Sequence, residues 1–266
     1  MKSKIGIIIE LIIVLLISNI FWVIAYGNGE SDYSMIFATI ASFVPMIFTL
    51  IVTKIKKEGW NNLGIRFSFK KGWKMYVFSI VGTLFTVYAT QFMMYLIFRD
   101  KVESTFTIAG LGQIGMMTVF GIACFIEMLG EKLGWIGYFF PKLEKMSGTL
   151  SACLLLGLIR GIYHLGIIFY MEHPVVVFVE ITISNIVMTP FMIYMFRRSE
   201  SIFPCTISHG MANLLPIFIS YNNDWYYGNP LAIIVGMIPS LILSLYSLYA
   251  MKKKGFLIGC NRRESN

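Results

Sequence analysis

Ionisable side chains stand at helical spacing inside otherwise apolar sequence, and their types suit hydrolytic chemistry. The residues concerned are Glu127, Glu131, Arg160, His164, His209 and Asn213. They form three pairs with a spacing of four, so each pair lies on one face of a helix, and Trp135 extends the first face. An ionisable group is costly inside a membrane and marks a functional site by default. We therefore expect the three polar faces to point inward at one another.

Peptide hydrolysis needs an activated water and donors that stabilise the oxyanion. A glutamate can activate water, and histidine and asparagine can donate. The spacing permits this chemistry without assigning the roles. In a competing interpretation, Glu127 and Glu180 are buried acids that pair with Arg160 or Lys132.

Two other mechanisms are compatible with these residues. Glu131, His164 and His209 can be drawn as three ligands of a catalytic zinc with one open position. The HExxH signature is absent, so a zinc site would need three separate helices, and we expect no cofactor. Cys205, one turn before His209, permits a thiol nucleophile, although a buried cysteine usually only packs.

The composition requires these residues to be held in a membrane. The chain has 266 residues, of which 57% are hydrophobic and 14% charged, and its mean hydropathy is +0.72. Soluble domains carry about a quarter charged residues. We predict an all-α, polytopic transmembrane bundle forming a single domain, 1–266, with about eight spans of roughly 20 residues. The expected spans are 5–25, 33–52, 75–98, 114–126 with its continuation, 149–169, 175–196, 202–220 and 231–250.

Basic residues orient the predicted bundle. They concentrate in alternate connections, such as the segment Ile55–Lys74 and the stretch after residue 250. By the positive-inside rule both termini are cytoplasmic and the protein is a multi-pass protein of the cell membrane. The net charge of +8 then reflects anionic lipid headgroups as partners, and no nucleic acid is needed to explain it.

Three motifs together carry a resemblance to a known family. They are GEKLGWIGYFFPKL (Gly130–Leu143), GIYHLG (Gly161–Gly166) and SHGMANLL (Ser208–Leu215). Their order and spacing resemble the CPBP family, which comprises CAAX prenyl endopeptidases and bacteriocin-processing or self-immunity membrane proteins. The motif core is expected within 111–220. The resemblance implies that Glu131 is the water-activating base, that His164 shares the water, and that His209 and Asn213 donate to the oxyanion.

The first motif departs from the family pattern EExxxR. Lys132 stands where a second glutamate is usual, and Ile136 stands where the arginine is usual. Arg160 occupies a position that is usually aromatic. We hypothesise that Arg160 supplies the positive charge near Glu131 from the neighbouring helix, so that Glu127, Trp135 and Arg160 are supporting residues.

The resemblance implies an intramembrane endopeptidase that acts on a small membrane-associated or lipidated peptide, such as a bacteriocin or pheromone precursor. A non-catalytic bacteriocin self-immunity protein of the same family is the alternative. A transporter with an ion path through Glu127, Glu180 and Arg160 is a third class, but the chain has no inverted repeat to support it.

Overall fold

The computed structural model describes residues 2–27, 33–104, 125–214 and 219–257. Its elements, in chain order, are α1 (Lys2–Gly27), α2 (Ser34–Ile55), η1 (Trp60–Leu63), α3 (Phe69–Ile97), η2 (Arg99–Lys101), β1 (Val102–Ser104), η3 (Leu133–Phe139), α5 (Phe140–Ser147), α6 (Thr149–Tyr163), α7 (Leu165–Ile168), α8 (Pro174–Ser199), α9 (Phe203–Leu214), β2 (Ile219–Tyr221), α10 (Asn223–Tyr227) and α11 (Pro230–Lys253). Parts of two predicted spans, 114–124 and 215–218, lie outside the described residues.

Five helices are long and apolar enough to cross a membrane: α1, α2, α3, α8 and α11. Each coincides with a predicted span. Their outward faces carry exposed aliphatic side chains, for example Leu16 at 60% and Ile20 at 57% on α1. Such surfaces are unfavourable in water but suit a lipid environment. The all-α, multi-pass membrane architecture predicted from the sequence is therefore confirmed.

Two other predicted spans are shorter helices. α6 has 15 residues, and the described part of α9 has 12. α6 ends at His164, where the backbone N–H turns to the Gly161 carbonyl, and the chain restarts as the four-residue α7. Gly166 lies against the Asn19 carbonyl of α1 at a spacing that leaves no room for a side chain. This close approach holds α7 against α1.

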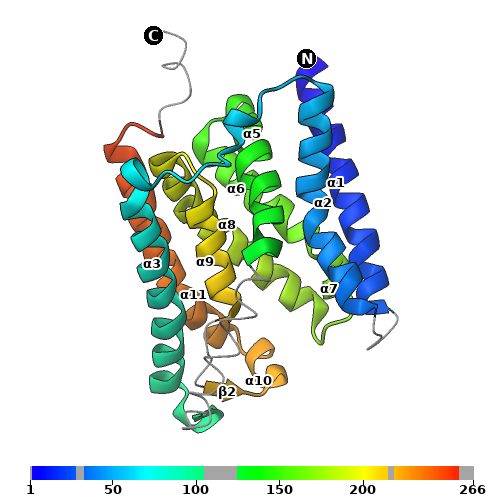
Figure 1. Ribbon diagram of the computed structural model, residues 1–266. Helices are drawn as coiled ribbons and strands as arrows, with labels where there is room; N and C mark the ends of the chain where they lie inside the picture. Colours follow the sequence, from blue (N-terminus) through cyan, green and yellow to red (C-terminus); the bar gives the residue numbers. More distant parts are fainter. Residues whose placement is uncertain (1, 28–32, 105–124, 215–218, 258–266) are drawn as a thin grey trace.

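The helices form a bundle in which α1 and α2 pack as one pair and α3, α8, α9 and α11 form the opposite group (Figure 1). α6 packs on α8. Residues 125–147 run as one continuous helical segment between the two groups, with the π-helix η3 at its centre. This segment contains the first sequence motif.

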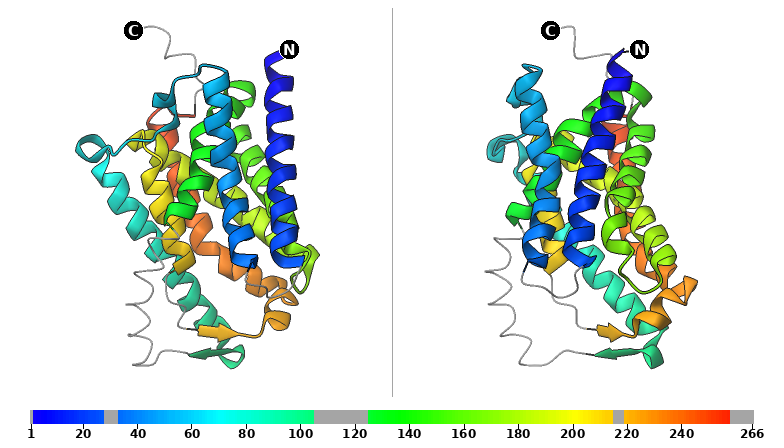
Figure 2. Two further views of the ribbon diagram at one scale, coloured as in Figure 1. Left: turned by 45° about the vertical axis from the view of Figure 1, so that its right-hand side comes forward. Right: turned by 90° about the vertical axis from the view of Figure 1, so that its right-hand side faces the viewer.

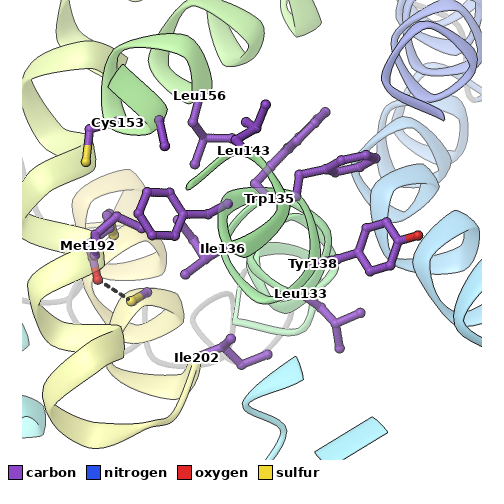
Figure 3. Close-up of a cluster of buried hydrophobic side chains, with 14 of the residues drawn as sticks. Leu133, Trp135, Ile136, Tyr138, Leu143, Cys153, Leu156, Met192 and Ile202 are labelled. Atoms are coloured by element: carbon purple, nitrogen blue, oxygen red, sulfur yellow. Dashed lines mark hydrogen bonds between the residues drawn. The ribbon is translucent and has the colours of Figure 1, made fainter. Parts of the chain in front are cut away.

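Apolar side chains of α6 and α8, such as Leu156 and Met192, pack around η3 together with Ile202 before α9 (Figure 3). All seven residues of η3 are buried. Polar contacts anchor one edge of it: Glu10 of α1 accepts a hydrogen bond from the Tyr138 hydroxyl at 2.9 Å and also pairs with Lys56. The motif segment is thus fixed between the two helix groups.

The two ends of the bundle differ. α1 begins and α11 ends at the same end (Figure 1). At the other end β1 and β2 form a short antiparallel ladder from Val102↔Tyr221 to Ser104↔Ile219 (Figure 2). This two-stranded ladder is a small departure from the predicted all-helical architecture.

Candidate active site

Glu131 and Lys132 lie where the motif helix changes from α to π geometry. Residues 125–132 are α-helical and η3 begins at Leu133. Gly134 and Gly137 follow, and they allow the helix to approach other backbone closely: a Cβ on Gly134 would lie 2.8 Å from the Pro45 carbonyl oxygen. Short π segments occur frequently at functional sites.

The Glu131 carboxylate is at the centre of a buried polar cluster. Its side chain is 3% exposed, and its Oε2 atom lies 3.8 Å from each of three nitrogens. These are Nζ of Lys132, Nη2 of Arg160 and Nδ1 of His209. The cations and the histidine come from the motif helix, α6 and α9. Among the described residues, no group forms a hydrogen bond with Oε2.

Arg160 lies beside Glu131, as hypothesised from the sequence. Its side chain is 4% exposed, and its Nε atom has no hydrogen-bond partner within the described part of the chain. The guanidinium and Lys132 approach the same carboxylate oxygen. Two buried cations therefore face one carboxylate.

Lys132 contacts His209 more closely than it contacts Glu131. The Lys132 Nζ and His209 Nδ1 atoms are 2.6 Å apart. The lysine side chain has 0% exposure, whereas His209 is 20% exposed. The sequence presented Lys132 as a departure from the family motif and as a candidate partner of Glu127 or Glu180, and not as a partner of His209. The signal that marks it was present, because it is an ionisable residue next to Glu131 inside an apolar run.

His164 caps the end of α6 and belongs to the same electrostatic cluster. It interacts with the charges of Glu131, Arg160 and Lys132, and its ring stacks edge-on against Tyr163 at 4.8 Å. Its Nδ1 atom lies 2.6 Å from the Arg160 carbonyl oxygen. A carbonyl oxygen only accepts, so Nδ1 donates. The Nε2 lone pair of the neutral ring is then left to accept a proton.

The remaining expected residues lie at the edge of this cluster. Glu127 accepts a hydrogen bond from the Ser42 hydroxyl at 2.8 Å. Trp135 is fully buried and packs edge-on against Tyr163, with ring centroids 5.4 Å apart. Asn213 is exposed, and its amide lies 3.6 Å from the Met128 sulfur.

The expected pairing of the other acids with the buried cations is not what the structure contains. Glu127 is bonded to Ser42, and Glu180 accepts from the Tyr226 hydroxyl at 3.2 Å. Arg160 and Lys132 face Glu131 instead. The reason is proximity: Glu131 is adjacent to Lys132 on the same helix, and α6 brings Arg160 to that point.

Cys205 packs in the apolar cluster. Its thiol donates to the Met192 carbonyl at a distance of 3.2 Å (Figure 3), and the side chain is fully buried. This arrangement fits the packing role better than the thiol-nucleophile alternative.

The zinc alternative does not fit the residues that are present. Within the described ranges, no group of three metal-ligating side chains is close enough to hold a metal ion. The Lys132 ammonium lies against His209 Nδ1, and Arg160 adds a second positive charge beside Glu131. Two buried cations repel a dication. The positive charge of the cluster therefore argues against a zinc ion at this site.

The fold and the site together define a multi-pass helical membrane protein with a buried acid, base and histidine cluster. Residues 113–215 match the family described as type II CAAX prenyl endopeptidase Rce1-like, which confirms the resemblance to the CPBP intramembrane proteases predicted from the three motifs. No curated protein matches the chain. All of the expected site residues fall within the matched segment.

Proposed function

We propose that the protein is an intramembrane endopeptidase that hydrolyses a peptide bond of a small membrane-associated or lipidated peptide, such as a bacteriocin or pheromone precursor. The observation that carries this proposal is the position of Glu131. Its carboxylate is buried, has an oxygen without a hydrogen-bond partner among the described residues, and lies 3.8 Å from His209. The family match supports a protease of the CAAX type.

In the proposed mechanism, Glu131 removes a proton from a water whose oxygen attacks the carbonyl carbon. His164 accepts a hydrogen bond from the same water through Nε2. The tetrahedral oxyanion receives hydrogen bonds from His209 and from Asn213, one turn further along α9. The C–N bond then breaks, and the proton on Glu131 passes to the leaving amine. Glu127, Trp135 and Arg160 hold this arrangement in place.

The proposed setting is the cell membrane, crossed about eight times, with both termini in the cytoplasm. α1 starts and α11 finishes at the same end of the bundle (Figure 1). This arrangement supports an even number of crossings. Exposed Trp60 and Phe67 in the basic segment Ile55–Lys74 support its placement along the interface, with anionic lipids as partners.

The test compares the peptides in membranes that contain the wild type, Glu131→Gln or Glu180→Gln, each with and without a chelator. Glu180→Gln is the control because it alters another acid of the bundle, which is half-buried and bonded to Tyr226 away from the cluster. We expect cleaved peptides to disappear with Glu131→Gln and to persist with Glu180→Gln and with the chelator. Peptides that persist unchanged with Glu131→Gln would exclude this mechanism.

A second candidate is a non-catalytic self-immunity protein. The contact between Lys132 and His209 favours it, because a cation stands where the family pattern has an acid. Protection of cells against a bacteriocin, measured for the wild type and Glu131→Gln, separates the two functions. Equal protection by both proteins, with no peptide cleaved by either, would establish immunity without proteolysis.

A further inference from the structure

Lys132 is a buried lysine whose nitrogen contacts two members of the cluster, His209 and Glu131. Its side chain has no exposed surface, and its nitrogen lies 2.6 Å from His209 Nδ1 and 3.8 Å from Glu131 Oε2. A buried charge without a hydrogen bond is strongly unfavourable. The imidazole nitrogen therefore serves as the acceptor that the ammonium requires, and the carboxylate partly balances its charge.

The direction of this hydrogen bond determines the protonation pattern of His209. An ammonium has three donors and no acceptor, so Nδ1 of His209 accepts. In the neutral ring the proton must then be on Nε2. The opposite holds at His164, where Nδ1 donates to the Arg160 carbonyl oxygen and Nε2 is left without a proton. The two histidines are thus held as opposite tautomers.

We propose that Lys132 is a positioning residue that holds His209 as the Nε2–H tautomer, so that His209 donates a hydrogen bond while His164 accepts one. The catalytic consequence rests on the proposed endopeptidase function. The tautomer itself does not, because it follows from the Lys132 contact alone. Lys132, which replaces the second glutamate of the family motif, thereby has a role: it makes His209 the histidine that donates a hydrogen bond.

The charges that act on Lys132 come from three elements. Glu131 on the same helix favours the ammonium. Arg160 on α6 opposes it, and the Cys205 thiol and His209 on α9 also interact with it. The Lys132 nitrogen therefore lies between the His209 ring, 2.6 Å away, and the Glu131 carboxylate, 3.8 Å away.

Nitrogen-15 NMR of the full chain in lipid bilayers, labelled at histidine, tests this proposal directly. The chain has only three histidines, and His209→Gln assigns the signals of His209. Protonated and unprotonated ring nitrogens have well-separated chemical shifts. The variants are Lys132→Met, which keeps the length without the charge, and Lys132→Arg, which keeps a donor. Lys142→Met is the matched control, because Lys142 pairs with Glu58 away from the cluster.

We expect His209 to be protonated at Nε2 in the wild type, in Lys132→Arg and in Lys142→Met. In Lys132→Met, which also removes the donor, we expect Nδ1 protonation to appear. A wild-type ring protonated at Nδ1, or a tautomer that is unchanged in Lys132→Met, would overturn the proposal. If Lys132→Met does not fold, a wild-type or Lys132→Arg ring protonated at Nδ1 would still overturn the proposal.

Activity measurements separate this proposal from the proposed function. With a cleavable peptide, kcat should fall in Lys132→Met with little change in KM, and Lys132→Arg should restore part of it. The loss should be smaller than the roughly 10²–10³-fold loss expected when an oxyanion donor is removed outright. If the His209 tautomer changes in Lys132→Met but the protein cleaves no peptide, the positioning role is supported and the proposed endopeptidase function is rejected. An unchanged kcat in Lys132→Met, in a protein that cleaves peptide, would overturn the catalytic part of the positioning role.

Discussion

At the scale of single residues, the site is defined by one carboxylate facing two cations. Glu131, Lys132 and Arg160 are each no more than 4% exposed, so their charges act on one another with little screening by water. Removing one member of such a set leaves an uncompensated buried charge. Lys132, at the position where the family pattern has an acid, and Arg160 on α6 therefore both balance the charge of Glu131.

The coupling between Glu131 and Arg160 can be measured by a double-mutant cycle. We expect Arg160→Leu alone to lower the free energy of unfolding by roughly 3–5 kcal/mol, because it leaves a buried carboxylate with one fewer partner. In the Glu131→Gln background the same change should cost clearly less. Denaturant unfolding in detergent provides the measurement. Equal losses in the two backgrounds would show that the two side chains do not interact.

At the scale of elements, the π-helix η3 adjusts the motif helix to its neighbours. Gly137 lies under Leu63 of η1, and a Cβ at this position would lie 2.5 Å from the Leu63 carbonyl oxygen. Gly134 approaches Pro45 of α2 with similar closeness. These contacts fix the height of η3 and therefore the position of Glu131 at its N-terminal edge.

Gly137→Ala tests this packing. The added methyl group would press on backbone, so we expect a loss of about 1–3 kcal/mol in the free energy of unfolding, together with reduced activity. Gly6→Ala on α1 is the control, since a Cβ there has nothing within 4 Å. It should leave stability unchanged or slightly raised. Equal stability of the two variants, measured by thermal unfolding, would contradict the close approach of η3 and η1.

At the scale of the whole molecule, the bundle has two unlike ends. One end carries the start of α1 and the end of α11 (Figure 1), and basic residues such as Lys253 lie there. The other end carries the β1–β2 ladder with an aromatic cluster, in which Tyr221 stacks on Tyr226 at 4.8 Å. Burial and the nearby Glu180 raise the pKa of the Tyr226 hydroxyl above its ordinary value.

Labelling single cysteines with a membrane-impermeant thiol reagent tests the orientation of these ends. The background replaces Cys124 and Cys260, while Cys153 and Cys205 are buried. In intact cells we expect Glu103→Cys to react, and Lys4→Cys and Lys253→Cys to react only after the cells are opened. Reaction of Lys4→Cys and Lys253→Cys on opposite sides would contradict an even number of crossings.

The sequence alone determined the membrane class, five of the spans and the polar positions of the site. Long apolar runs and pairs four residues apart are local properties, and they are sufficient to place Glu131, His164 and His209 on inward faces. Sequence motifs also sufficed for the family resemblance, because they depend on residue order and not on contacts.

Only the tertiary structure decided which charges meet. The pairing of Glu131 with Arg160 and the contact of Lys132 with His209 join residues on different helices, and no periodicity within one helix specifies such distances. The π geometry of η3 depended likewise on neighbouring backbone at Leu63 and Pro45. Contacts between helices depend on how whole elements pack. The contact of Lys132 with His209 could therefore be read from the fold but not from the motif that contains Lys132.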